Sequence, residues 1–243
     1  MKIDIFKKFI GVIFSPGETF LSLSKSKESQ WIVAGLVLGV DYAILNLLIN
    51  ITPEVLYMKA LGLMDAEENL SFFEAEAKIR SFTILGMFLI PLLVFLKLFI
   101  ISGISFRMAS IFPNKKDFKN SLTVASFTEI IPFSGYFLSF IFLLCHRPGH
   151  YAQVQDLKIT LGLNLLSIFN QAEIGLWKYT FLQECDFFTM WYIIVLTLGI
   201  SIANRLRIRY SFLIALILFV SKFLISYFWA RFEVYNFIPQ LFF

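Results

Sequence analysis

Five long apolar stretches, each separated from the next by polar residues, dominate the pattern along this chain. A helix needs about 20 apolar residues to cross about 30 Å of hydrocarbon, and each stretch is close to that length. Aromatic residues gather where some of them begin, as at 187–192, which is typical of a segment anchored at a membrane interface. The pattern predicts an all-α polytopic integral membrane protein. We expect a five-helix transmembrane bundle with short interfacial amphipathic helices and spans at about 31–50, 81–105, 121–145, 187–204 and 210–229.

Residues 1–30 precede the first span and are amphipathic. Apolar residues recur at helical spacing at positions 3, 6, 10 and 13, flanked by 9 and 12. The charged residues group on the opposite side: Lys2, Asp4, Lys7 and Lys8. This predicts a short basic helix that lies in the cytoplasmic interface, with a loosely ordered tail as the alternative. The sequence 15–18 then breaks the helix, and a second short amphipathic piece is expected over 19–27.

Two of the connections between spans carry signals of their own. In the acidic loop after the first span, Ser71 and Glu74 have the spacing of a capping box, in which the two side chains satisfy free backbone donors at a helix start. The second span is therefore expected to begin at Ser71 as an acidic extension outside the membrane. The apolar residues 157–169 are too few to cross, so we expect a helix lying in the outer interface.

Composition narrows the class of protein further. Hydrophobic residues make up 58% of the 243 residues and charged residues 16%, whereas soluble domains average about 25% charged residues. Little sequence remains for a separate water-facing domain, so a single membrane domain is expected over 1–243. The formal net charge of +4 does not indicate nucleic-acid binding, because no basic run with interleaved aromatic residues stands apart from the spans.

The basic residues predict an orientation instead. If the N-terminus lies inside, the inner segments hold twelve lysines and arginines and the longer outer segments hold seven. Cytoplasmic loops carry the excess of lysine and arginine in membrane proteins. The distribution predicts a cytoplasmic N-terminus and a C-terminus outside.

Four charged residues fall inside the predicted spans: Asp41, Lys97, Glu129 and Lys222. Such residues cost several kcal/mol when they face lipid, so they are expected to face the bundle interior and to pair. At 1.5 Å per residue, Glu129 lies about 10 Å and Lys97 about 12 Å from the cytoplasmic edge, on adjacent antiparallel helices. A Lys97–Glu129 pair is therefore expected. The cluster is either a polar pathway or ligand site, or a structural pair with lysines that reach towards an interface.

The remaining candidates are weaker. Pro91 and Pro132 each remove a backbone hydrogen bond and are expected to kink their helices, with Pro132 freeing the carbonyl of Thr128 beside Glu129. Cys145 and Cys185 both fall at outer ends of spans and would form a disulfide only if their Cα atoms approach within about 7 Å. The two histidines are His146 and His150, and a zinc site needs three or four converging ligands. We therefore expect no metal and no cofactor.

The order of sparse aromatic, proline and glycine positions resembles that of the Yip1 family of five-span membrane proteins. The matching residues are 14–20 (Phe-Ser-Pro-Gly-Glu-Thr-Phe), Trp31, Ser126-Phe127, Pro132, and Phe188-Thr-Met-Trp191 through Gly199. Eukaryotic members are Golgi and endoplasmic-reticulum proteins that interact with Rab GTPases through a long cytoplasmic N-terminal region. This chain has only about 30 residues there, so that role does not carry over. The resemblance implies five helices and the bacterial inner (cytoplasmic) membrane.

The function expected from these observations is non-enzymatic. The chain contains no His-Glu-x-x-His motif and no glycine-rich phosphate loop, and a nucleophile with its base cannot be assembled from the residues of the spans. We expect a membrane scaffold, or a trafficking or envelope-organisation factor, that binds the lipid bilayer and other membrane proteins or itself, and no nucleic acid. The alternative is a component of a membrane transporter that uses the intramembrane polar cluster.

Overall fold

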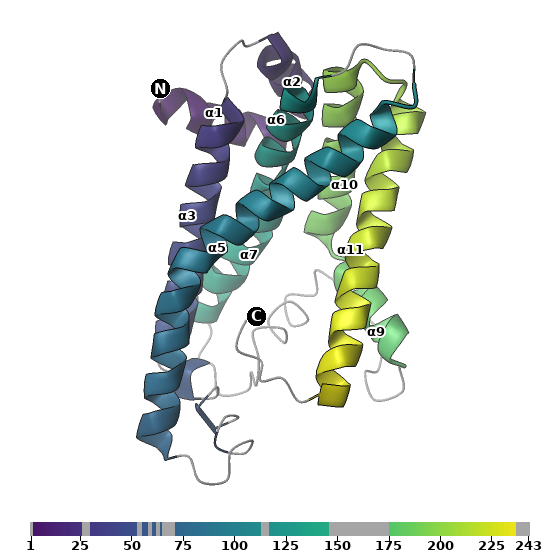
Figure 1. Cartoon of the computed structure of the whole chain (residues 1–243). Coiled ribbons are helices and arrows are strands. Elements are labelled where there is room, and N and C mark those ends of the chain that lie inside the picture. Colours follow the sequence, from purple (N-terminus) through teal and green to yellow (C-terminus); the bar gives the residue numbers. More distant parts are fainter. Residues whose placement is uncertain are drawn as a thin grey trace. The chain divides into compact units, whose positions relative to one another are not determined.

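The structure is a computed structural model, and it describes residues 2–25, 30–52, 55–57, 60–61, 64, 71–112, 117–145 and 175–236. Within these ranges the regular elements are helices, and five helical stretches are long and apolar enough to cross a membrane (Figure 1). The predicted all-α fold with five spans is confirmed. The candidate spans are Gln30–Ile51, Phe72–Ala109, Phe118–Phe142, Phe187–Asn204 and Ile208–Phe228.

The helices and their bounds are as follows. The structure has α1 (Lys2–Phe14), α2 (Pro16–Lys25), α3 (Gln30–Ile51), α5 (Phe72–Ala109), α6 (Phe118–Thr128), α7 (Ile130–Cys145), α9 (Leu176–Glu184), α10 (Phe187–Asn204) and α11 (Ile208–Asn236). The interface helix expected over 157–169 lies outside the described residues.

The chain divides into two compact units, and α3, α5, α7 and α11 contribute residues to both. Unit 1 comprises Met1–Gly39, Leu92–Gly135 and Phe187–Leu224. Unit 2 comprises Val40–Pro91, Tyr136–Asp186 and Ile225–Phe243. The expectation of a single membrane domain stays a prediction.

Unit 1 contains the larger hydrophobic core, in which α2, α6 and α10 meet. Phe20 of α2 and Phe127 of α6 are at most 2% exposed. The approach to α10 is close: a Cβ atom on Gly199 would lie 2.6 Å from Val124 Cγ1 and 3.1 Å from ring atoms of Phe20. Only glycine lets α10 pack this near to the two helices, since real Cβ atoms do not approach other atoms so closely.

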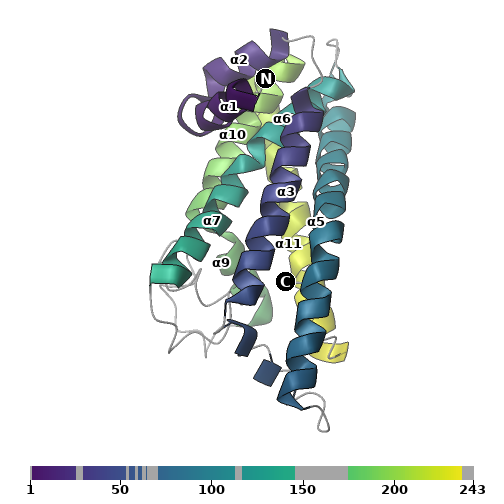
Figure 2. The same cartoon turned by 90° about the vertical axis from the view of Figure 1, so that its left-hand side faces the viewer.

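The N-terminal helices are docked on this core. Figure 1 and Figure 2 both show α1 and α2 beside α6. In α1 the buried residues are Ile5, Phe9 and Val12, and Phe9 packs on Phe127 with ring centroids 5.1 Å apart. Of the predicted apolar face, the flanking positions 9 and 12 pack on the protein, whereas Phe6 is 66% exposed and Ile10 44% exposed. The helix has two apolar faces, and periodicity alone does not say which one meets the core.

The break between α1 and α2 is shorter than expected, because α2 already begins at Pro16. Proline is favoured at the first helical position, where its missing N–H costs no hydrogen bond. Thr19 N–H donates to the Ser15 carbonyl over 3.2 Å, which continues the chain directly into α2. The helix predicted over 19–27 thus extends over Pro16–Lys25.

In unit 2 the capping box is confirmed at the start of α5. The backbone N–H and the hydroxyl of Ser71 donate to Glu74 Oε2 over 2.9 and 2.6 Å, and Glu74 N–H donates to Ser71 Oγ over 3.4 Å. The first turns of α5 pack through Ala75 and Ile79 on Leu56 and Ala60. The capping box and this small core explain why α5 begins at Phe72, nine residues before the apolar stretch predicted as the span.

Candidate functional site

The third span is interrupted at Glu129. Pro132 has no N–H and cannot donate to the carbonyl of Thr128, four residues earlier. Accordingly α6 ends at Thr128 and α7 begins at Ile130, with Glu129 between them. The span predicted as one helix over 121–145 is therefore two helices in sequence. Glu129 itself keeps helical backbone angles (φ −61°, ψ −16°), so its carboxylate lies beside the one carbonyl that Pro132 cannot bond.

Glu129 is paired with Lys97. The ammonium Nζ of Lys97, on α5, donates a hydrogen bond to Glu129 Oε1. The two ends of the pair differ in exposure: the Glu129 side chain is 1% exposed and the Lys97 side chain 46%. The lysine stem thus lies along the outside of unit 1 and its charged end reaches inward. A buried carboxylate needs such a partner, because an uncompensated charge in a low-dielectric interior is strongly destabilising.

Tyr192 of α10 is the third member of this site, and sequence reasoning missed it. Its phenol lies close enough to Glu129 to interact with the carboxylate electrostatically, and its side chain packs against the core of unit 1. The sequence shows Tyr192 only as part of an aromatic cluster at the start of a span, which is the usual signature of interface anchoring. No spacing rule connects a tyrosine on the fourth span to a glutamate on the third.

The other predicted site residues have different surroundings. Lys222 lies on α11 in unit 1 and is exposed. Its membership of an intramembrane polar cluster stays a prediction. Asp41 lies on α3 in unit 2 and is half-buried. Pro91 is half-buried inside α5, which continues through it as one helix. Of the four charged residues, the structure brings Lys97 and Glu129 into contact.

The arrangement can hold a charge pair but offers little for catalysis. A carboxylate and an ammonium in contact can exchange a proton, yet Glu129 is fully buried. The hydroxyls of Ser102, Ser126 and Thr128 donate to the carbonyls four residues earlier in their own helices over 2.6 to 2.8 Å. These polar groups are satisfied within the helices and require no water or ligand.

Three further buried polar side chains were not predicted. Ser121 at the start of α6, Asn204 at the end of α10 and Ser211 at the start of α11 are at most 2% exposed. Both amide atoms of Asn204 and the hydroxyls of the two serines have no hydrogen-bond partner among the described residues. A buried amide without partners costs free energy. Small polar residues at helix ends are so common that the sequence gives no sign of this burial.

Replacing Asn204 with leucine is therefore expected to raise the free energy of unfolding by about 1 kcal/mol or more, because it removes a buried amide that gains no hydrogen bond. Thermal unfolding in detergent measures the change. The matched control is Asn50→Leu. Asn50 is also buried, but its amide donates to the carbonyl and to Oδ1 of Asn46 over 2.8 and 3.1 Å, so its loss should lower stability. Equal effects of the two substitutions would contradict the prediction.

The cysteines are free in this structure, with Cys145 exposed and Cys185 half-buried. Both histidines lie outside the described residues, and within the described ranges no three histidine, cysteine, aspartate or glutamate side chains converge on a metal position. Burial raises the pKa of the Cys185 thiol, and the neighbouring charges of Asp186 and Glu184 raise it further.

The raised pKa predicts a difference in reactivity. At a mildly alkaline pH a smaller fraction of Cys185 is thiolate, the form that reacts, so Cys185 should be alkylated several-fold more slowly than the exposed Cys145. The rates are measured with a maleimide on the single variants Cys145→Ser and Cys185→Ser, which leave one thiol each. Raising the pH should narrow the difference. Equal rates at both pH values would contradict the assignment.

The comparison with known families addresses the chain as a whole. A family model described as the Yip1 domain matches residues 10–230. The chain belongs to the Yip1 family. No match to a curated protein or to a solved structure was found.

The residues on which the Yip1 resemblance rested largely meet in unit 1. Phe20, Phe127 and Gly199 come from α2, α6 and α10, and all three lie in its core. Gly135 of α7 is similarly close to Phe188 of α10, since a Cβ there would lie 2.7 Å from the Phe188 ring. Phe20, Phe127, Phe188 and Gly199, on which the resemblance rested, are thus packing positions in this protein.

Proposed function

We propose that this Yip1-family protein is a non-enzymatic membrane scaffold that organises other membrane proteins or lipids around its helices. The observation that carries the proposal is the burial of Glu129: its side chain is closed off from the surface and held by Lys97. A pair of this kind fastens α5 to the α6–α7 junction. A pathway for ions would need water or substrate to reach the carboxylate.

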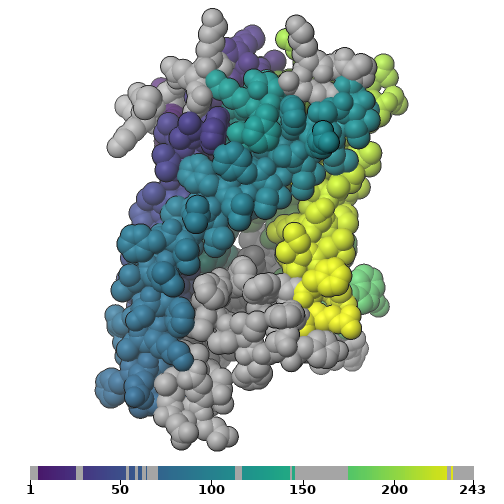
Figure 3. Space-filling view, in the orientation of Figure 1, coloured from purple at the N-terminus to yellow at the C-terminus, as the bar shows by residue number. Residues whose placement is uncertain are grey.

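Partner binding has a suitable surface on α5. In the part of α5 that belongs to unit 1, several apolar side chains are more than half exposed, among them Leu92, Leu93 and Leu96, and Figure 3 shows side chains of α5 at the surface. Exposed apolar residues in a span meet either lipid or another helix, since both are equally apolar. The position therefore suits a test for neighbouring proteins.

Photo-crosslinking from α5 tests the scaffold. A photoreactive amino acid at Leu92, 64% exposed, is expected to capture the same membrane proteins in repeated experiments in cells, followed by purification in mild detergent. The same amino acid at Ile225 of α11, 69% exposed, is the matched control for general membrane neighbours. Identical capture profiles from both positions would contradict a specific partner surface on α5.

The competing function is transport through the polar cluster, and it is favoured by the presence of Lys97, Glu129 and Tyr192 within spans. Proteoliposomes decide between the two. A proton or ion flux that is abolished by Glu129→Gln, in a variant that still melts like the parent protein, would replace the scaffold proposal with transport.

We also propose that the protein is a single membrane domain in the bacterial inner membrane, with a cytoplasmic N-terminus and its C-terminus outside. The excess of lysine and arginine in the segments on the N-terminal side supports this orientation. Reporter enzymes that are active only outside the cytoplasm, fused after Phe243, should be active; fused after Asn204 they should be inactive.

A further inference from the structure

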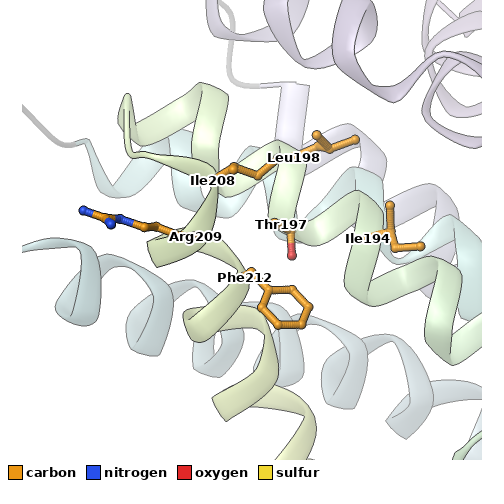
Figure 4. Close-up of a pocket in the computed structure, with 6 residues that line it drawn as sticks. All are labelled: Ile194, Thr197, Leu198, Ile208, Arg209 and Phe212. Atoms are coloured by element: carbon orange, nitrogen blue, oxygen red, sulfur yellow. The ribbon is translucent and has the colours of Figure 1, made fainter.

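An apolar groove lies between the end of α10 and the start of α11 in unit 1. It measures about 360 Å³ and is lined by Ile194, Thr197, Leu198, Ile208, Arg209 and Phe212 (Figure 4). Pockets that hold small molecules have volumes of about 300 to 1,000 Å³. Ile194, Ile208 and Phe212 are each about half exposed, so the groove opens on the outer surface of the unit, where a span meets lipid.

Apart from Arg209, the residues that line the groove offer it no free hydrogen-bond donor. Thr197 donates its hydroxyl to the Ile193 carbonyl over 2.7 Å, and its hydrogen-bonding capacity as a donor is used within α10. Ile194 lies ten residues before Asn204, the last residue of α10, which corresponds to about 15 Å along the helix. That distance is about half the thickness of the hydrocarbon core. The groove thus has the length and polarity that suit one acyl chain.

A guanidinium group stands at one end of the groove. In Figure 4 the Arg209 side chain extends away from the side chains of Thr197 and Phe212. Its Nη2 donates to Tyr210 Oη over 3.0 Å, and its Cζ lies 4.8 Å from the Tyr210 ring centroid. Tyr210 in turn packs on Phe112 with ring centroids 4.5 Å apart. Among the described residues this hydrogen bond uses one of the five donors of the guanidinium, which leaves the others for an anion.

The surroundings of Arg209 are strongly basic. Arg205 and Arg207 are exposed in the turn between α10 and α11, and Arg209 is exposed in the first turn of α11. The sequence 187–221 contains no acidic residue. Within the described part of the chain, neither Arg207 nor Arg209 forms an ion pair. Guanidinium groups bind phosphate through two parallel hydrogen bonds. The charge at the mouth of the groove is therefore complementary to a phosphate attached to the acyl chain.

We propose that the groove between α10 and α11 binds an anionic phospholipid, with its phosphate on Arg209, assisted by Arg207, and one acyl chain along Ile194, Leu198 and Phe212. A lipid tail gains no hydrophobic free energy by moving from the bilayer into an apolar groove. Selectivity therefore resides in the headgroup. The lipid would be a ligand of the proposed scaffold, and its biological role rests on that proposed function. Lipid binding itself does not, since it depends on the groove and the arginines and not on a partner protein at α5.

The test uses the full chain in mild detergent and native mass spectrometry, with equal amounts of phosphatidylglycerol and phosphatidylcholine of identical chains. The parent protein should retain the anionic lipid about fivefold more strongly, the effect expected for one arginine near the headgroup. Arg209→Gln should abolish that preference, and Arg209→Lys, which keeps the charge without the planar fork, should retain part of it. Ile194→Trp, which narrows the groove, should reduce retention of both lipids.

Arg107→Gln is the matched control, because Arg107 is an exposed arginine at the end of α5 and its loss changes the net charge equally. It should leave the preference intact. An equal loss in Arg107→Gln would mean general attraction to the basic surface and would overturn the site, as would an unchanged preference in Arg209→Gln. A second copy of the chain bound at this face, seen as a dimer that Ile194→Trp dissociates, would also overturn it. Failure of crosslinking from Leu92 would remove the scaffold proposal and leave this result standing.

Discussion

Replacing Lys97 with methionine is expected to lower the free energy of unfolding by about 3 kcal/mol, because it leaves the buried carboxylate of Glu129 without its ammonium partner. The figure lies at the lower end of the range for broken buried pairs because the lysine side chain is 46% exposed. Its own desolvation penalty in the folded protein is correspondingly small. Reversible unfolding in mixed micelles, followed by circular dichroism, measures the loss.

A double-mutant cycle separates the pair from the packing of the lysine stem. The double variant Lys97→Met with Glu129→Gln carries no buried charge, so it should recover about 2 kcal/mol relative to the sum of the single losses. Lys178→Met is the matched control, since Lys178 is an exposed lysine on α9. It should change stability by about 0.5 kcal/mol at most. Additive effects in the cycle would rule out a stabilising pair.

The position of the spans follows from hydropathy, whereas the packing between them does not. In a membrane protein the surface that faces lipid is as apolar as the surface that faces the core. Ile194 and Leu196 of α10 illustrate this: the first is 48% exposed and the second 1%. The same ambiguity explains the N-terminal helix, where Phe9 is buried and Phe6 is exposed although both are phenylalanines. In a soluble protein the exposed face of a helix is polar, so the opposite, apolar face is identified as the buried face.

Charged and proline residues carry more information, because the bilayer restricts where they are tolerated. Depth counting placed Lys97 and Glu129 at similar levels, and the structure has them in contact. Pro132 indicated an open carbonyl at Thr128, and the helix ends at that residue. Tyr192 and Asn204 gave no such signal, since their roles depend on neighbours that are distant in sequence. Charge and backbone chemistry thus predicted local features of the site, and only the fold supplied its third residue.

Enlarging Gly199 is expected to have the largest effect among the packing substitutions. Gly199→Leu should lower the free energy of unfolding by about 3 kcal/mol or more. Even its Cβ would lie 2.6 Å from Val124 Cγ1, and the rest of the side chain has to displace Phe20. Gly199→Ala should cost about 1 to 3 kcal/mol. The loss should be accompanied by release of α2 from α10, which limited proteolysis of the N-terminal segment detects as faster cleavage.

Gly103→Ala provides the matched control, because a Cβ at Gly103, inside α5, meets nothing within 4 Å. It should stabilise the protein by up to about 1 kcal/mol, since alanine has the higher helix propensity. Val124→Ala removes the Cγ1 atom that a Cβ at position 199 would strike, so it should offset part of the loss in Gly199→Ala. The double variant Val124→Ala with Gly199→Ala is compared with its two single variants. If it loses as much stability as the two single variants together, the contact between α6 and α10 is not the reason that position 199 requires glycine. A smaller loss in the double variant would show that Gly199 is needed for the packing of the N-terminal helices on the spans. This structural role accounts for the glycine of the Yip1 resemblance without a ligand.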